Sequence, residues 1–222
     1  MWTIRYSGGD EMNSFSEDIF CYPVKMECPY CYHSGPIQIY PELSGWTGRK
    51  LILDGKIFVY RCRTCHRSFA VNYHLIYTDE AHGFFLENIP EEQTDTEPME
   101  REGVFSFCRY TEEISRLQEK LLIFSHGRDD RVIEVLKIRV SQRTGKGPFH
   151  YSGSLKDGTI ILQNSTAAFR TEVYVPSWEY ETVLRLSKLD DLRAGKETWV
   201  DEAYGRALLA RIRKKSGYPF IT

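Results

Sequence analysis

Two pairs of closely spaced cysteines constrain the folding of this 222-residue chain more than any other feature of its sequence. The first pair lies in Cys28-Pro29-Tyr30-Cys31 and the second in Cys62-Arg63-Thr64-Cys65. Each pair sets two thiols across a tight turn, where both sulfurs can point at one ion. Four thiolates fill the tetrahedral coordination sphere of Zn²⁺ and leave no position open for water. The sequence therefore predicts a structural zinc ion bound by Cys28, Cys31, Cys62 and Cys65.

The distance between the two pairs is longer than in the common four-cysteine pattern, which has roughly 15–20 intervening residues. We expect a short helix over Leu43 to Leu53, stopped by Gly55, to account for the extra length. Such a helix would be inserted between the two arms of a ribbon and would leave the four thiols free to meet.

Redox catalysis is one alternative for these cysteines. The first pair reads like a glutaredoxin active site, which needs its first cysteine at the start of a helix. Gly35-Pro36 follows the second cysteine too closely to allow that helix. The second pair with His66 also matches a haem attachment pattern, but haem is attached in this way outside the cytoplasm and the chain shows no export signal.

A histidine ligand is the other alternative, since His33 and His66 closely follow the two pairs. Four thiols already saturate zinc, so we interpret both histidines as surface residues. The remaining cysteines, Cys21 and Cys108, stand among aromatic residues and are expected to be small buried apolar side chains.

Charge and hydropathy exclude several classes of protein. The chain carries 29 basic and 31 acidic residues, a net charge of −2, which argues against binding nucleic acid or anionic lipid by bulk charge. It has neither a secretory signal pattern nor an apolar run of about 20 residues that would span a membrane. We therefore expect a cytoplasmic protein, in whose reducing environment paired cysteines are more often metal ligands than disulfides.

The composition changes along the chain and predicts an α+β fold in two domains. A flexible arm over residues 1–19 precedes a zinc-ribbon-like antiparallel β domain over residues 20–90. Residues 91–103 carry six acidic residues against one arginine and are expected to form an acidic linker. A second, mixed α+β domain follows over residues 104–222.

Helix signals in this second domain are local and specific. Asp129 and Asp201 stand where N-caps belong, and Thr111 is a third candidate cap, before a stripe formed by Ile114, Leu117 and Leu121. The acidic pair Asp129-Asp130 is explained by capping and by pairing with the flanking arginines more simply than by catalysis. The chain contains no phosphate-binding loop, nucleophile elbow or zinc-protease motif, so it shows no recognisable catalytic machinery.

Several spaced segments resemble the bacterial CpXC family over roughly residues 26 to 137. They are the first cysteine pair, Tyr40-Pro41-Glu42-Leu43, Leu53-Asp54-Gly55, the second pair, Tyr73 to Tyr77 with Asp79, Arg116 to Leu121 and Asp129 to Glu134. The resemblance implies a zinc-ribbon-like domain with Cys28, Cys31, Cys62 and Cys65 as ligands, and it implies no enzymatic activity. This chain departs from the pattern at Tyr32 and His66, where a glycine would relax the turn, and its second pair lacks a proline.

Three functions are consistent with these features. The favoured hypothesis is a zinc-binding protein whose ribbon serves interaction or regulation through contacts with a protein partner. The second is nucleic-acid binding through the basic face formed by Arg61, Arg63 and Arg67. The third is an enzyme in residues 104–222 whose site the sequence does not display.

Overall fold

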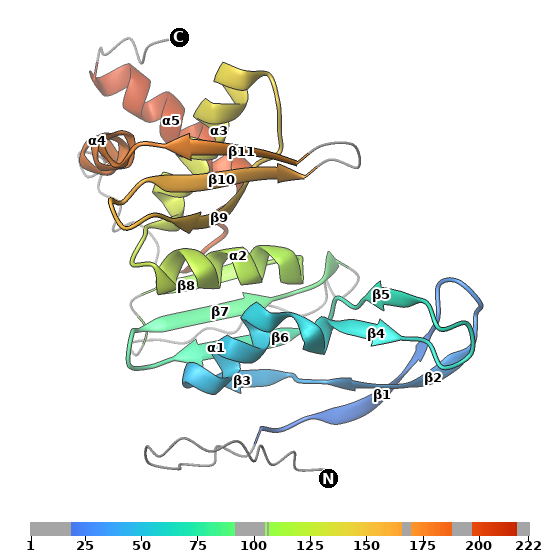
Figure 1. Cartoon of the computed structure of the whole chain (residues 1–222). Coiled ribbons are helices and arrows are strands. Elements are labelled where there is room, and N and C mark those ends of the chain that lie inside the picture. The colour runs from blue at the N-terminus through green and yellow to red at the C-terminus, as the bar shows by residue number, and fades with distance from the viewer. Residues whose placement is uncertain (1–18, 92–104, 106, 166–169, 188–196, 217–222) are drawn as a thin grey trace. The chain divides into compact units, whose positions relative to one another are not determined.

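The computed structural model describes residues 19–91, 105, 107–165, 170–187 and 197–216. Helices and strands are both present, which confirms the predicted α+β class. The chain divides into two compact units, Met1–Leu117 and Gln118–Thr222 (Figure 1). Within the described ranges, no helix is both long and apolar enough to cross a membrane.

Two antiparallel hairpins form one end of the first unit, as the prediction of a zinc-ribbon-like domain requires. The strands of the first hairpin are β1 (Tyr22–Glu27) and β2 (Ser34–Ile39), and those of the second are β4 (Val59–Arg61) and β5 (Ser68–Ala70). Each cysteine pair occupies the turn of one hairpin. Figure 1 shows the two turns side by side, so the hairpins bring together sequence segments that lie far apart.

Helix α1 (Gly45–Asp54) and the short 3-10 helix η1 (Lys56–Phe58) connect the two hairpins. Gly55 ends α1 in the left-handed conformation, with φ of 69°, and its N–H bonds to the carbonyls of Leu51 and Ile52. The helix predicted over Leu43 to Leu53 is therefore confirmed with a shift of one or two residues. It is the insertion that lengthens the spacing between the cysteine pairs.

A mixed sheet completes the first unit, beside the antiparallel hairpins that the sequence predicted. The strands that this unit contributes to it are β3 (Glu42–Ser44), β6 (Leu75–Asp79), β7 (Phe84–Asn88) and β8 (Phe107–Thr111). The β6–β7 pair is antiparallel, whereas β3 pairs with β6 and β7 with β8 in parallel. Ile76, Phe85 and Cys108 are buried together here, so Cys108 is a core residue as expected.

Strand β8 lies beyond the predicted acidic linker, yet it belongs to the sheet of the first unit. Its register with β7 runs from Phe84–Phe107 to Asn88–Thr111. Thr111 ends this strand and its hydroxyl donates to Asn88, so it does not cap the helix that follows. Residues 1–18 of the predicted arm and 92–103 of the predicted linker lie outside the described residues, and both assignments stay predictions.

The second unit combines a three-stranded antiparallel sheet with packed helices. Helix α2 (Ile114–Ser125) spans the division between the units. The elements that follow it are α3 (Asp130–Thr144), β9 (His150–Ser154), β10 (Ile160–Ser165), β11 (Arg170–Val175), α4 (Ser177–Ser187), β12 (Glu197–Thr198) and α5 (Glu202–Ser216). The sheet order is β11-β10-β9, and α3 packs against both α4 and α5. The predicted caps are confirmed, because Asp129 accepts from the Arg131 amide and Asp201 from the Tyr204 amide.

Five charged side chains are buried together in the second unit, each at most 6% exposed. They are Glu119 and Lys120 on α2 and Asp130, Glu134 and Lys137 on α3. Lys120 lies 3.0 Å from Asp130, and Lys137 lies 2.8 Å from both Glu119 and Glu134. Glu119 also accepts a hydrogen bond from the Tyr151 amide at 2.6 Å. The network joins α2 to α3 and β9, and every charge in it has an opposite partner.

Removing one lysine from this network is expected to destabilise the protein strongly. The substitution Lys137→Met leaves Glu119 and Glu134 buried without their shared cation, which costs roughly 3–5 kcal/mol. Urea unfolding of the full chain measures the loss. The control Lys146→Met, at an exposed position, is expected to change stability by less than about 0.5 kcal/mol. Equal effects of the two substitutions would contradict a structural role for the network.

Candidate metal centre

The four predicted cysteines meet at the tips of the two hairpins of the first unit. Cys28 Sγ lies 3.7 Å from Cys65 Sγ, and Cys31 Sγ lies 3.6 Å from Cys62 Sγ. All four sulfurs lie within 4.8 Å of one another. Each short distance joins one hairpin to the other, so the cluster links the two arms of the ribbon.

The two turns that carry the cysteines have the same backbone hydrogen bonds. In the first turn, the Cys28 N–H donates to the His33 carbonyl at 3.0 Å and the Tyr32 N–H to the Cys28 carbonyl at 2.9 Å. In the second, the Cys62 N–H donates to the Arg67 carbonyl at 2.9 Å and the His66 N–H to the Cys62 carbonyl at 3.0 Å. The turns are thus equivalent knuckles, and each presents its two thiols in the same way.

Tyr32 and His66 hold the left-handed backbone position of each knuckle, with φ of 58° and 57°. They are the only non-glycine residues with positive φ in the described part of the chain. A side chain in this conformation costs roughly 1–2 kcal/mol relative to the usual one. The presence of Tyr32 and His66 where glycine would be favoured therefore strains the backbone locally, and contacts elsewhere in the structure offset this cost.

The sulfur positions fit a single tetrahedral ion. Four metal–sulfur bonds of about 2.3 Å give a tetrahedron with edges of about 3.8 Å, close to the two short distances between hairpins. Cys28 and Cys62 are each 1% exposed, while Cys31 and Cys65 are half-buried. Four thiolates complete a tetrahedral sphere, so the arrangement can hold an ion but leaves no coordination position for a substrate.

Backbone groups and neighbouring sulfurs shift the acidity of two of the thiols in opposite directions. Hydrogen bonds from the Cys65 and Thr64 backbones lower the pKa of Cys62 to about 6, and the Thr64 N–H lies 3.4 Å from its sulfur. The His33 backbone lowers the pKa of Cys31, but burial and the bonds to the other three sulfurs raise it to about 12. Because metal binding requires all four thiolates, loading the site must release protons.

Aromatic and cationic side chains join the two knuckles around the sulfurs. Arg67 lies over the Tyr30 ring at 5.1 Å, and Tyr30 meets the edge of Phe69 at 6.4 Å. Phe69 also packs against Tyr60 at 5.4 Å, and the Arg61 Nε donates to the His66 carbonyl at 3.2 Å. These contacts were not predicted, because the sequence does not reveal which aromatic residues of the two hairpins face each other.

The remaining candidates lie outside the sulfur cluster. His33 and His66 are exposed and are absent from the group of described residues that could hold a metal ion. Cys21 is buried, as expected for a small apolar side chain. Arg61, Arg63 and Arg67 are all exposed around the second knuckle.

Comparison with known protein families finds a match to part of the chain. The model of the family described as CpXC protein matches residues 26–137, which is 112 of the 222 residues. The matched region contains all four clustered cysteines and both knuckles. No curated protein and no solved structure matches the chain.

The two equivalent knuckles allow a matched test of the backbone strain. The substitution His66→Gly is expected to stabilise the protein by about 0.5–1 kcal/mol, because glycine adopts positive φ without strain. The control His33→Gly, at the neighbouring position of the first knuckle where φ is not positive, is expected to destabilise by about 0.5–1 kcal/mol. Denaturant unfolding of the metal-loaded chain measures both. A loss of stability in both variants would show that no strain is stored at His66.

Proposed function

This chain belongs to the CpXC protein family, and from that membership and its four-thiol cluster we propose that it is a zinc-binding protein of the cytoplasm whose ribbon mediates contacts with a protein partner. The observation that carries the proposal is the tetrahedral spacing of Cys28, Cys31, Cys62 and Cys65 at the tips of two equivalent knuckles. In this proposal the ion has a structural role and takes no part in a reaction.

The chemistry of the four donors supports zinc. Thiolates are preferred ligands of zinc, and four of them form the closed sphere that is typical of its structural sites. A single iron ion shares this geometry, so the metal must be identified by measurement. None of the described cysteines is in a disulfide.

The surface of the ribbon supports a role in protein contacts. Tyr32 is 75% exposed and Tyr30 49%, at the tip of the first knuckle, and Val59 is 57% exposed on the second hairpin. Large exposed side chains of this kind are enriched at protein interfaces, with tyrosine and arginine contributing most to binding energy.

Nucleic-acid binding and catalysis remain weaker hypotheses. Two of the three arginines proposed to contact phosphates are engaged within the ribbon, Arg61 with a carbonyl and Arg67 with the Tyr30 ring. In the second unit, the buried carboxylates of the ion network are paired with lysines, which is the pattern of a structural network.

The first test measures the metal and its role in stability. Purified protein is expected to contain one zinc ion per chain by elemental analysis, and the double substitution Cys28→Ser with Cys62→Ser is expected to abolish zinc binding and lower the thermal midpoint of the first unit. A chelator and acid are expected to have the same effect as the double substitution, because protons and the chelator compete for the thiolates and the metal.

Cys21 provides the matched control for this test. The substitution Cys21→Ala removes a buried cysteine outside the cluster and is expected to leave the zinc content unchanged. Protein without zinc, or a double variant that retains both zinc and its melting temperature, would contradict the proposal. Iron found in place of zinc would preserve the structural role and correct the metal.

A second test examines the surface around Tyr32. A photo-reactive phenylalanine analogue at position 32 is expected to cross-link a protein partner in cells, because that side chain stands exposed at the knuckle tip. The same analogue at position 174, which is 53% exposed in the second unit, is the control and is expected to give no such product. Loss of the cross-linked product in the zinc-free double variant would show that cross-linking requires the folded ribbon. Recovery of RNA or DNA instead of protein would favour the nucleic-acid hypothesis.

A further inference from the structure

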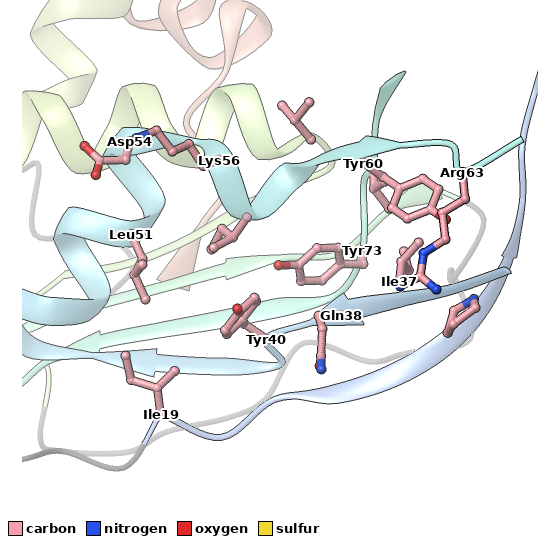
Figure 2. Close-up of a pocket in the computed structure, with 14 residues that line it drawn as sticks. Ile19, Ile37, Gln38, Tyr40, Leu51, Asp54, Lys56, Tyr60, Arg63 and Tyr73 are labelled. Atoms are coloured by element: carbon pink, nitrogen blue, oxygen red, sulfur yellow. The ribbon is translucent and has the colours of Figure 1, made fainter. Parts of the chain in front are cut away.

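The first unit contains a cavity of about 430 Å³ beside the second knuckle (Figure 2). It lies between strand β2, helix α1 and the segment that runs from η1 to Tyr73. Its volume is within the range of sites that bind small organic molecules, roughly 300–1,000 Å³. The four sulfurs are not part of its lining, so it is a separate feature of the ribbon.

The walls of this cavity are apolar and aromatic. Its aliphatic and aromatic lining includes Ile37, Leu51, Ile57, Val71, Tyr40, Tyr60 and Tyr73. Figure 2 shows Tyr73 in the middle of this group, with Tyr40 beside it and Leu51 on the α1 side. Such walls suit a flat, apolar ring, which stacks on or meets the edges of tyrosine rings.

The hydroxyl of Tyr73 is a donor that needs an acceptor. The residue is 5% exposed, and its ring packs on Phe58 at 5.6 Å. Its hydroxyl has no hydrogen-bond partner of normal geometry among the described residues. Burial raises the pKa of Tyr73 above its usual range, against an opposing effect of the Tyr40 backbone, so the phenol stays protonated. An oxygen atom of a ligand would satisfy this buried donor.

The charges at the rim of the cavity favour an anion. Asp54 and Lys56 stand together at the α1 end, where their charges offset each other, and Arg63 stands at the opposite end (Figure 2). The Arg63 side chain extends from the knuckle toward Ile37 on β2. In the described part of the chain no carboxylate pairs with Arg63, so one positive charge at the rim lacks a partner. A guanidinium binds a carboxylate with two parallel hydrogen bonds.

We propose that this cavity binds a small aromatic carboxylate, with its ring between the tyrosines, its carboxylate on Arg63 and a further oxygen on the Tyr73 hydroxyl. This inference goes beyond the proposed function, because it concerns a small molecule and not the protein partner. It also gives the second knuckle a second role. Arg63 lies between two of the clustered cysteines, so a fixed knuckle holds the group that binds the anion.

The experiment uses the full-length protein as purified and 2-naphthoxyacetate as the probe, since this compound combines an aromatic ring, an ether oxygen and a carboxylate. Amide shifts in a ¹⁵N NMR titration are expected at residues of the cavity lining, such as Gln38, Leu51 and Val71. The neutral amide of the same compound is expected to bind at least tenfold more weakly, and the affinity for the acid is expected to fall as salt is added.

Matched variants separate the cavity from the rest of the surface. The substitution Leu51→Trp fills the cavity and is expected to abolish binding, whereas Leu53→Trp, on the same helix but outside the lining, is expected to preserve it. Arg63→Gln is expected to weaken binding about tenfold, and Arg211→Gln, an equal change of charge at an exposed site of the second unit, is expected to have no effect.

Tyr73→Phe keeps the ring and removes only the unsatisfied hydroxyl, so it decides the outcome if Leu51→Trp does not fold. It is expected to weaken binding several-fold without lowering stability. Three outcomes would overturn the proposal: no binding at millimolar probe, equal affinity for the acid and its amide, or shifts that map away from the cavity. Binding by protein that contains no zinc would refute the proposed metal and leave this inference standing.

Discussion

The meeting of four sulfurs at the tips of two hairpins is the constraint on which the architecture of the ribbon depends. The second hairpin has strands of only three residues each, and two-stranded sheets of that size are marginal in water. Its backbone hydrogen bonds fix the shape of the second knuckle, but they do not fix the position of this knuckle relative to the first hairpin. The thiols and the rings of Tyr30 and Phe69 do so, because both reach across from one hairpin to the other.

The second unit is stabilised by close helix packing and buried ion pairs. Its helices bury aliphatic side chains together with the ion network of α2 and α3, and Gly205 of α5 lies so close to α3 that a Cβ atom would stand 2.9 Å from Glu134 Cβ. The stability of such a close-packed interior depends on many side-chain contacts together. The contact between the two hairpins of the ribbon depends mainly on the four-cysteine cluster. We therefore expect removal of the proposed metal to destabilise the first unit without unfolding the second.

The elements that the sequence predicted correctly depend on signals within a few residues. Each of these signals determines the structure of the turn or helix end in which it lies. They are the cysteine spacing, the cap residues Asp129 and Asp201, and Gly55, which ends α1. The elements that were missed depend on pairing over long distances. Strand β8 pairs with β7 across the acidic segment, and helix α1 and the second hairpin lie between the parallel partners β3 and β6 in the chain. The charges of Glu119 and Lys120, side by side in the sequence, resemble a solvated face until α3 and β9 cover them.

The three arginines of the second knuckle have a common explanation in the charge of the proposed metal site. Four thiolates around one divalent cation carry a net charge of −2, and nearby cations stabilise that charge in a partly buried setting. Arg61 and Arg67 are held beside the second knuckle by a carbonyl and by the Tyr30 ring, where their positive charges would offset that of the proposed site. Arg63 is a third positive charge beyond the two that offset this net charge, and it is the one that stands at the rim of the cavity. The basic face that the sequence suggested for nucleic acid can therefore serve both proposals, with Arg61 and Arg67 offsetting the charge of the metal site and Arg63 binding an anion.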